Sequence, residues 1–490
     1  MPLPRRSRLL HSLYKLSTTE NNRSRTSHSQ FLRDFAFKRA ISTATIAEDG
    51  TLQPNVIHGK TLGLRSFILN RPYRLNALNL SMIRNIYPQL QAWEQSDNCK
   101  LIIMKGAGKN EFCAGDDVRD VLAQVKNQDP DALHFYKEEY DLVHYISMLK
   151  TPYIAVMNGH SLGAALGLSA HAPFRIATEN TIFAIPEAGL GLFPAAGASF
   201  FLPRLDGQIG TYLALTGKRL EGIQAFYAGV ATHYVPSNRL EQLEDRLSDM
   251  ETSDHEVINM VLEEYATLTE TKVIGFDAEI RQIIDRCFRF DTVDAIIEAL
   301  DKEKPTSFTR ESKSKLLHYS PTSLRVILRL LRAGAKMSLG ECLKMEYDLV
   351  QKFLATPDFL EGVDTMLVQK ARQRKPKWQP AALSEISSET ITERYFSYPS
   401  PNALQLRSSL DFKEYPYQRY SLPTEAEVKA AILGESPEFR NSGGIAGTEE
   451  AVRWFKIERR KKKGVEEKVR DIISRKTIIF DGKLCWQASL

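Results

Sequence analysis

Two neighbouring stretches decide the fold class of this chain: residues 157–180, MNGHSLGAALGLSAHAPFRIATEN, and residues 184–205, AIPEAGLGLFPAAGASFFLPRL. Just before the first, Tyr153–Met157 forms a short apolar run typical of a buried strand. The chain then turns at Asn158 and Gly159 into a segment of small residues that favours a buried helix. The succession of strand, turn and helix predicts an α/β core.

The segments on either side repeat this alternation. Residues 61–69 have the pattern of a strand, residues 81–93 carry apolar residues at helical spacing, and residues 101–104 form another short apolar strand. From about Glu241 onward the pattern becomes mostly helical. No glycine-rich dinucleotide or P-loop motif follows a strand, which argues against those two kinds of nucleotide site.

Composition excludes several classes of protein. The chain has 490 residues, of which 43% are hydrophobic and 26% charged, enough for a large core and too apolar for a disordered chain. Its net charge of +5 is small, so any contact with nucleic acid must be local. The five cysteines lie far apart without a CxxC pair, which predicts neither a disulfide framework nor a metal site. The charge-free stretch 151–174 carries too many polar residues for a membrane span.

The N-terminal segment, residues 1–45, has the composition of a mitochondrial transit peptide. From Met1 to Ala47 there are nine Lys and Arg residues against two acidic ones, with many serines and no apolar core. Basic, serine-rich and acid-poor segments are typical of mitochondrial import. The sequence therefore predicts a location in the mitochondrial matrix, with an ordinary N-terminal tail as the alternative.

The C-terminal segment, residues 391–490, is predicted to be an extension of the main domain. It begins near SYPSPN, residues 397–402, which resembles a linker, and it contains a basic segment at 456–476. That segment holds ten Lys and Arg residues against four acidic ones. Such a run is either a solvated helix face or a contact to RNA phosphates, and the sequence leaves both open.

The candidate chemistry is carried by turns. Gly115–Asp116 and Gly163–Ala165 are small-residue turns at expected helix starts, where free backbone N–H groups can bind a negative charge. Two such turns facing each other would form an oxyanion hole. Glu187 follows an apolar stretch, and a carboxylate in apolar surroundings has a raised pKa suited to a general base or nucleophile. A glutamate after proline is also common as an ordinary first residue of a helix.

The motifs also carry a resemblance. FCAGDDVR (112–119), LNRPYRLNAL (69–78) and the two stretches quoted first resemble the crotonase, or enoyl-CoA hydratase, superfamily. Within it, the chain is most similar to the 3-hydroxyisobutyryl-CoA hydrolases. The likeness continues through YKEEY (136–140), YSPTSLRVILRLL (319–331), KMEYDLVQ (344–351) and PKWQP (376–380), covering roughly residues 61–386.

The resemblance implies a fold and a set of domains. The expected fold class is α/β, a crotonase (ClpP/crotonase-like) core of repeated ββα units at residues 55–240, with a mostly helical part at 241–390. The expected substrate is an acyl-CoA thioester whose coenzyme A is part of the substrate, so that neither a separate cofactor nor a metal is implied.

The resemblance also assigns residues to roles. The backbone N–H groups of Asp116 and Ala164 would form the oxyanion hole. Glu187 would attack the thioester or activate water, and Glu139 would help to place the acyl group or the water. These roles agree with the chemistry, because a thioester needs its developing oxyanion stabilised and a nucleophile held close by.

Three positions depart from the hydrolase pattern. Asp116 and Ala164 replace glycines of the two turns, and Ala195 stands where the pattern has an aspartate. The methyl group of Ala195 cannot accept a hydrogen bond, and loss of one positioned acid–base group costs about 10² to 10⁴ in rate. An ionised Asp116 would oppose the oxyanion unless its side chain turns away or pairs with Arg119.

Three hypotheses therefore follow. The leading one is a mitochondrial thioester hydrolase that converts 3-hydroxyisobutyryl-CoA to 3-hydroxyisobutyrate and coenzyme A in valine breakdown, with impaired catalysis. The second is a structural subunit of the mitochondrial small ribosomal subunit derived from this hydrolase family, contacting ribosomal RNA or proteins through the basic segment. The third is another crotonase-type reaction on an acyl-CoA, although Gly167 stands where hydratases carry a second glutamate.

Overall fold

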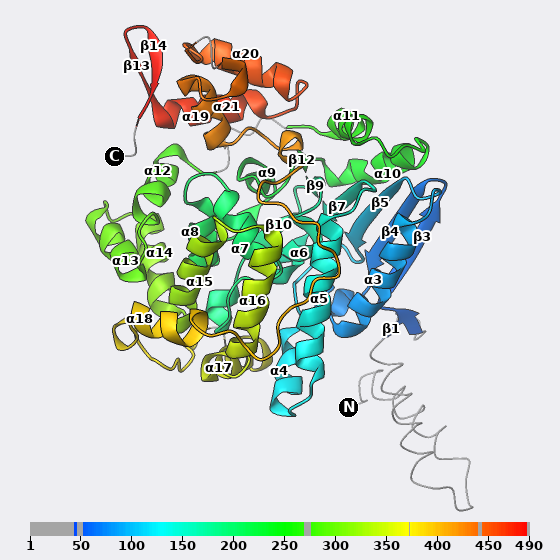
Figure 1. Ribbon diagram of the computed structural model, residues 1–490, viewed down its shortest axis with the longest axis vertical. Helices are drawn as coiled ribbons and strands as arrows, with labels where there is room; N and C mark the ends of the chain where they lie inside the picture. The colour runs from blue at the N-terminus through cyan, green and yellow to red at the C-terminus, as the bar shows by residue number, and fades with distance from the viewer. Residues whose placement is uncertain (1–43, 47–51, 269–275, 372, 440–442, 488–490) are drawn as a thin grey trace, which may run out of the picture.

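A computed structural model describes residues 44–46, 52–268, 276–371, 373–439 and 443–487 (Figure 1). The predicted transit segment lies outside these residues apart from its last two, and it stays a prediction. Among the described helices none is long and apolar enough to cross a membrane. In the same residues no group of three or more His, Cys, Asp and Glu side chains could hold a metal ion.

A six-stranded sheet forms the centre of the body, in the order β12-β9-β7-β5-β4-β3. All neighbours run parallel except the edge strand β3, which is antiparallel to β4. The strands are β3 (Val56–Thr61), β4 (Leu64–Leu69), β5 (Leu101–Gly106), β7 (Tyr153–Met157), β9 (Phe174–Ala177) and β12 (His233–Tyr234). Every residue of β7 and β9 is buried, as expected for parallel strands covered on both faces.

A second sheet has four strands, in the order β11-β10-β8-β6, and its strands alternate along the chain with those of the first sheet. Its strands are β6 (Glu111–Cys113), β8 (His160–Leu162), β10 (Ile182–Ala184) and β11 (Leu220–Glu221). Each of β5, β7 and β9 is followed by one strand of this smaller sheet before the next helix begins. This is a repeat of ββα units, and it confirms the predicted fold class.

The turn between β7 and β8 shows why the sequence needs glycine there. Gly159 has a φ of +114°, and a Cβ atom on it would lie 2.0 Å from the carbonyl carbon of Asn110. Only glycine tolerates both the backbone conformation and the contact. The tight turn lets each unit place its two strands in different sheets.

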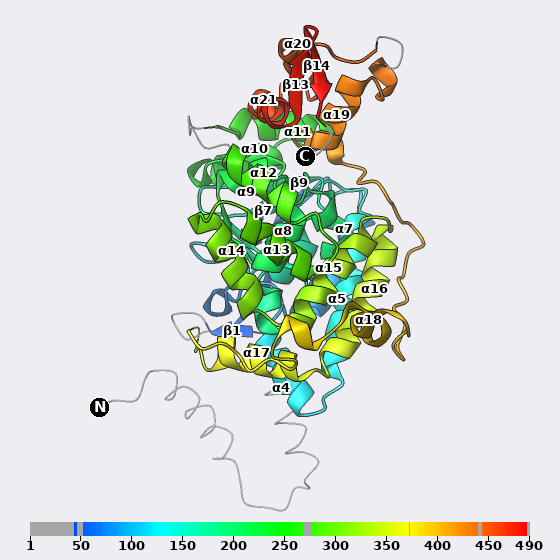
Figure 2. The same cartoon turned by 90° about the vertical axis from the view of Figure 1, so that its left-hand side faces the viewer.

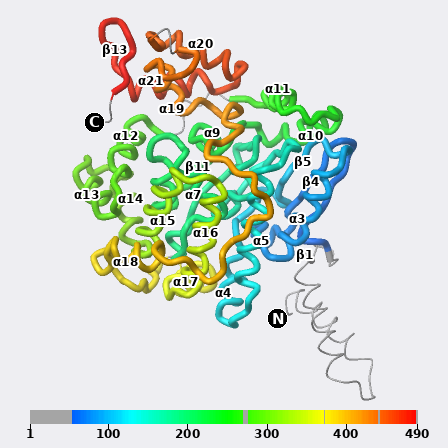
Figure 3. The backbone as a smooth tube through the Cα atoms, viewed as in Figure 1, coloured from blue at the N-terminus to red at the C-terminus, as the bar shows by residue number. Residues whose placement is uncertain are grey.

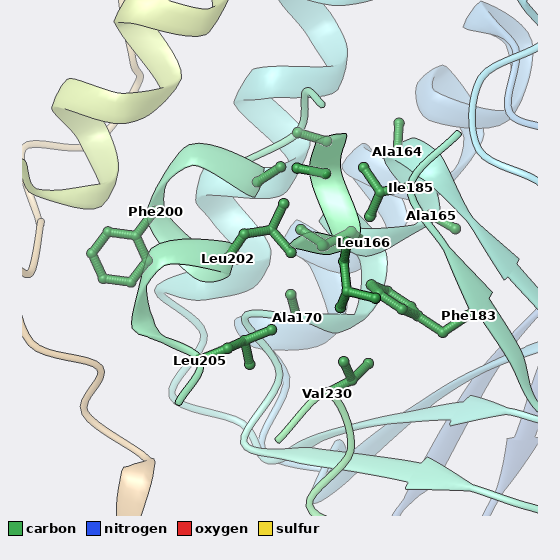
Figure 4. Packing of buried hydrophobic residues seen from close by; sticks show 14 of the residues in the cluster. Ala164, Ala165, Leu166, Ala170, Phe183, Ile185, Phe200, Leu202, Leu205 and Val230 are labelled. Atoms are coloured by element: carbon green, nitrogen blue, oxygen red, sulfur yellow. The ribbon is translucent and has the colours of Figure 1, made fainter. Parts of the chain in front are cut away.

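Helices pack around both sheets (Figures 1 and 2). Those of the core are α3 (Leu80–Glu94), α4 (Val118–Lys126), α5 (Asp131–Ser147), α6 (Leu166–Ser169), α7 (Ala198–Phe201), α8 (Ile209–Thr216), α9 (Ile223–Tyr227), α10 (Leu240–Ser248) and α11 (His255–Tyr265). Figure 4 shows Ala165, Leu166 and Phe183 in the buried cluster that holds the two sheets and α6 together.

The second part of the chain is helical, as expected. Its helices are α12 (Ala278–Cys287), α13 (Val293–Lys302), α14 (Ser307–His318), α15 (Pro321–Gly334), α16 (Leu339–Phe353), α17 (Pro357–Val363) and the one-turn α18 (Ser388–Ile391). Helix α15 begins at Pro321, because Ser320 caps it by accepting a hydrogen bond from Ser323 N and proline is favoured at the first helical position.

Residues 397–420, which include the linker expected at SYPSPN, connect the body to the C-terminal helices and lie along the body. Figure 3 shows this segment running along α16 and α5 toward the C-terminal helices. The hydroxyl of Ser400 donates to the carbonyl oxygen of Asp348 at 2.9 Å, and Leu339 N donates to Phe412 O at 3.0 Å. The segment is therefore a strap fixed to the body by hydrogen bonds.

The strap leads into a C-terminal lobe made of α19 (Glu425–Leu433), α20 (Thr448–Glu458), α21 (Val465–Lys476) and the hairpin β13 (Thr477–Phe480) and β14 (Lys483–Trp486). Eight of the ten cations of the basic segment form ion pairs within the chain. Four of them reach the body: Lys462 pairs with Glu263, Lys468 with Asp206 and Lys476 with Asp285, at 2.5 to 2.6 Å, and Arg460 pairs with Glu256 at 2.9 Å.

These ion pairs change the interpretation of the basic segment. Neither a solvated helix face nor an open RNA-binding patch describes it, because most of its cations are paired with carboxylates of the lobe or of the body. In the described part of the chain only Lys461 and Lys463 of this segment lack a carboxylate partner. A contact to RNA through this segment stays a prediction, with far fewer free charges to support it.

We expect the buried pair between Lys462 and Glu263 to be essential for stability. The Lys462 side chain is 1% exposed, so a Lys462→Met substitution leaves the carboxylate of Glu263 without its cation. Removing one partner of a buried pair costs about 3–5 kcal/mol of unfolding free energy. Chemical denaturation of the full chain measures the loss.

The matched control is Lys456→Met, which removes an exposed pair with Glu466 and should cost less than about 1 kcal/mol. Equal losses in the two variants would contradict the role assigned to Lys462.

Candidate functional site

The turn at Gly115 and the turn at Gly163 lie against each other, as an oxyanion hole made of two turns requires. Gly115 follows β6 with a φ of +79°, and a Cβ atom on it would lie 2.9 Å from the backbone nitrogen of Ala164. Ala164 is the second residue of a one-turn 3-10 helix, η2 (Gly163–Ala165), which follows β8. The ββα repeat thus brings the ends of two strands of the small sheet side by side.

The backbone N–H groups of Asp116 and Ala164 are available to an acceptor in this place. Asp116 forms a bridge with Leu78, but the bridge uses N–H groups of Leu78 and Asp117, which donate to Gly115 O and Leu78 O at 2.8 Å. Ala164 lies in the first turn of its helix, where N–H groups have no earlier carbonyl to bond. Both amides can therefore donate to one oxygen atom, the arrangement of an oxyanion hole.

Glu187 lies against the second of these turns. It is the first residue of the 3-10 helix η3 (Glu187–Leu190), it is 8% exposed, and a Cβ atom on Gly163 would lie 2.5 Å from its Oε1 atom. Burial raises the pKa of Glu187 to about 8, and the charge of Asp116 adds to the shift. The carboxyl is protonated at neutral pH and becomes a base only as the pH rises through about 8.

Glu139 and Asp116 form a pair of carboxyl groups. Glu139, on α5, is 1% exposed, and neither of its oxygens receives a hydrogen bond from an N–H or O–H group of another described residue. Burial, followed by the charge of Asp116, raises the pKa of Glu139 well above its usual range. Burial also raises the pKa of Asp116 to about 6, although the neighbouring carboxyl of Glu139 opposes the rise. Glu139 therefore holds its proton more tightly than Asp116 does.

The side chain of Asp116 thus faces Glu139, and Arg119 is not its partner. This answers the question that the sequence left open. The carboxylate of Asp116 lies beside the amides that would stabilise an oxyanion, and two more acids lie next to it. A developing negative charge in this place would be repelled by Asp116.

Ala195 lies in a turn held by an acid that the sequence analysis missed. Ala196 and Gly197, which follow it, have φ values of +59° and +85°. The carboxylate of Glu346, on α16, accepts hydrogen bonds from the backbone nitrogens of Gly197 and Ser199, both at 2.8 Å. Glu346 is fully buried, on the face of α16 that is otherwise apolar. An acid among the apolar positions of a helix is the sequence signal by which Glu346 could have been identified.

Gly167 leaves no space for a second acid. A Cβ atom on it would lie 2.6 Å from Cγ2 of Val143 and 2.8 Å from Cβ of Ala196. Packed interiors give way to such overlaps only at a cost of about 1–3 kcal/mol. The arrangement opposes the third hypothesis, a hydratase-like reaction with two glutamates.

Comparisons with known proteins agree with this geometry. The family model described as enoyl-CoA hydratase/isomerase matches residues 64–396. The small ribosomal subunit protein mS47 of Neurospora crassa is 40% identical over 90% of this chain and 90% of that protein. The mitochondrial 3-hydroxyisobutyryl-CoA hydrolase of Homo sapiens is 43% identical over 68% of this chain and 86% of that protein.

The fold has a close match among solved structures. The carnitinyl-CoA dehydratase from Mycobacterium thermoresistibile superimposes with a TM-score of 0.66 and 31% sequence identity. The match covers 72% of this chain and 99% of that protein. The part of this chain outside the match therefore has no counterpart in the dehydratase.

The raised pKa of Glu187 predicts that its removal stabilises the protein more at high pH. An acid whose pKa is raised in the folded state costs stability as the pH rises from its unfolded value of about 4.5 to about 8. Glu187→Gln removes this cost, so the variant should gain about 3–4 kcal/mol over wild type between pH 5 and pH 8. Chemical denaturation of both proteins at the two pH values measures it, and a gain independent of pH would contradict the assignment.

Proposed function

The chain belongs to the enoyl-CoA hydratase/isomerase family, and we propose that within it this protein is a structural component of the small ribosomal subunit in mitochondria. One observation carries the proposal: the chain continues beyond the family domain into a folded lobe joined to the body by buried ion pairs. The similarity to mS47 covers 90% of this chain and so extends into that region, whereas the similarity to the human hydrolase covers 68%.

The site supports the same proposal. Asp116, Glu139 and Glu187 crowd three acids beside the two amides, and Ala195 supplies no carboxylate. The ionised carboxylate of Asp116 opposes the stabilisation of an oxyanion, and the methyl group of Ala195 supplies no acid–base group, whereas Glu139 and Glu187 hold their protons at neutral pH. A fold can be kept for its surface after its chemistry has weakened, because function depends on sites and not on the fold itself.

The lobe offers a surface for such an assembly. Three consecutive residues of β13, Ile478, Ile479 and Phe480, are 49%, 76% and 70% exposed. An uncovered apolar strand at the edge of a two-stranded sheet is unfavourable in water and is suited to contact with another protein. The hairpin is therefore the part of the lobe that we expect to meet a neighbouring ribosomal protein.

Thioester hydrolysis is the second candidate, favoured by the position of Glu187 over the oxyanion turn. In this reaction the thioester oxygen would accept hydrogen bonds from Asp116 N and Ala164 N. Ionised Glu187 would either take a proton from a water molecule that attacks the carbonyl carbon, or attack that carbon itself to form an anhydride that water then hydrolyses. On either route the thioester C–S bond breaks, the thiolate takes up a proton, and the products are an acid and coenzyme A. The substrate favoured by the resemblance is 3-hydroxyisobutyryl-CoA.

The ribosomal proposal predicts cosedimentation. The tagged chain, expressed in its own cells, should sediment in a sucrose gradient with the small subunit of the mitochondrial ribosome. A double Ile479→Ser, Phe480→Ser variant should lose at least half of this association, because it removes the exposed apolar contact. Wild-type protein found only at the top of the gradient would contradict the proposal.

The hydrolase candidate predicts how turnover responds to the departures. Wild-type protein should hydrolyse 3-hydroxyisobutyryl-CoA slowly, and the double variant Asp116→Gly, Ala195→Asp should be at least tenfold faster, since one positioned acid–base group is worth about 10² to 10⁴. Glu187→Gln should abolish whatever turnover exists. Steady-state release of coenzyme A measures all three, with Asp120→Asn as a surface control for the loss of a charge.

Fast turnover by wild type, abolished by Glu187→Gln, would favour an active hydrolase despite Asp116 and Ala195. Slow turnover that neither variant changes would remove the hydrolase candidate.

A further inference from the structure

Arg175 is a buried cation without a counter-ion. It lies in β9 and is 2% exposed. Its Nε atom donates to Val230 O at 2.8 Å, and its Nη1 atom donates to Ala172 O at 2.9 Å and to the Tyr415 hydroxyl at 3.0 Å. Among the described residues no carboxylate lies within ion-pair distance of it. Buried charges in proteins are normally paired, because an unpaired charge is costly.

The pKa shifts around Arg175 agree with an uncompensated charge. Burial lowers the pKa of Arg175, and the only group that raises it is the Tyr415 hydroxyl. The positive charge of Arg175 in turn contributes to the lowered pKa values of His171 and Lys462. Among the described residues, no carboxylate forms an ion pair with Arg175 that would neutralise its charge.

A cavity of about 50 Å³ lies beside Arg175, at the seam between the body and the C-terminal extension. From the body it is lined by Arg175, Arg204 and Asp206, and from the extension by Ser421 and Lys468, among others. A volume of about 10–15 Å³ suffices for one water molecule, so this cavity has space for a small polyatomic ion. The cavity exists only because the extension covers this face of the body.

The charges that line the cavity do not cancel. Lys468 pairs with Asp206 at 2.5 Å, which neutralises both. Arg204 donates to backbone oxygens, such as Phe200 O at 2.7 Å, and forms no ion pair with a described carboxylate. Arg175 and Arg204 therefore leave an excess of two positive charges around the cavity.

The Nη2 atom of Arg175 points toward this seam. Its Nη2 atom makes only long contacts, 3.5 Å to Gly229 O and 3.4 Å to the Ser421 hydroxyl, and both of these residues line the cavity. A guanidinium whose outer N–H groups are held only by long hydrogen bonds can give these up to an oxyanion, and its fork matches the geometry of phosphate.

From this arrangement we propose that the cavity binds one phosphate-sized oxyanion, held by the Arg175 guanidinium and the Ser421 hydroxyl, which ties the C-terminal extension to the body. The ion supplies the negative charge that the two arginines lack. The proposal does not depend on the proposed function, since it concerns the seam and not the acidic site. The same chemistry could come from inorganic phosphate or from a phosphate group of RNA, and the experiment separates these sources.

The test is equilibrium dialysis of the full chain against radiolabelled orthophosphate, at constant ionic strength maintained with chloride. We expect saturable binding of one phosphate per chain, and a melting temperature that rises with phosphate concentration because the ion binds only the folded seam. Phosphate should also protect the strap from limited proteolysis. Absence of saturable binding would overturn the proposal.

Three variants assign the site. Arg175→Met should abolish phosphate binding, and Ser421→Val, which keeps both arginines but fills the cavity with methyl groups, should weaken it at least tenfold. The matched control Arg84→Met removes an exposed arginine paired with Glu138 and should leave binding unchanged. If Arg175→Met does not fold, Ser421→Val decides the outcome.

Binding that both seam variants leave intact would place the ion elsewhere and overturn the proposal. A short single-stranded RNA that displaces orthophosphate equally well from wild type and from the Arg84→Met control would identify a phosphodiester as the natural source. Failure of RNA to compete would identify a free inorganic ion.

Discussion

The contact between two turns is the constraint on which the rest of this structure depends. A Cβ atom on Gly115 would come within 2.9 Å of the backbone nitrogen of Ala164, so the turns can meet only with glycine at that position. The repeated ββα units exist to bring strand ends together in this way, and the buried strands β7 and β9 hold them rigid. The oxyanion arrangement is therefore a property of the backbone and survives changes in the side chains around it.

Those changes have altered what the site can do. Asp116 brings a carboxylate beside the two amides, and its charge contributes to the raised pKa values of Glu139 and Glu187. The side chain at 116 thus sets a negative charge next to backbone N–H groups that could receive one from a ligand. The same scaffold keeps its stability, because protonation of Glu139 avoids two adjacent buried charges.

Most cations of the basic segment in the C-terminal extension form ion pairs with carboxylates of the same chain. Lys462 and Lys468 bring cations to carboxylates of the body, and the strap at 397–420 follows α16 and α5 to deliver the lobe to its place (Figure 2). Ile478, Ile479 and Phe480 of β13 are exposed apolar residues of the lobe. The seam so created includes Arg175, a buried residue of the central sheet that lines the cavity together with residues of the extension.

The sequence by itself determined the α/β class and the two turns, because apolar periodicity and glycine placement act locally and can be read along the chain. The ββα repeat was expected only from the resemblance to the crotonase superfamily. The sequence could not determine where Asp116 points or that Glu346 holds the turn of Ala195, since both depend on α5 and α16 meeting the sheets from distant parts of the sequence. The basic segment shows the same limit. A count of charges gives their sign, but only the tertiary structure decides which carboxylates lie opposite them, because ion pairing depends on distances in space that composition does not contain.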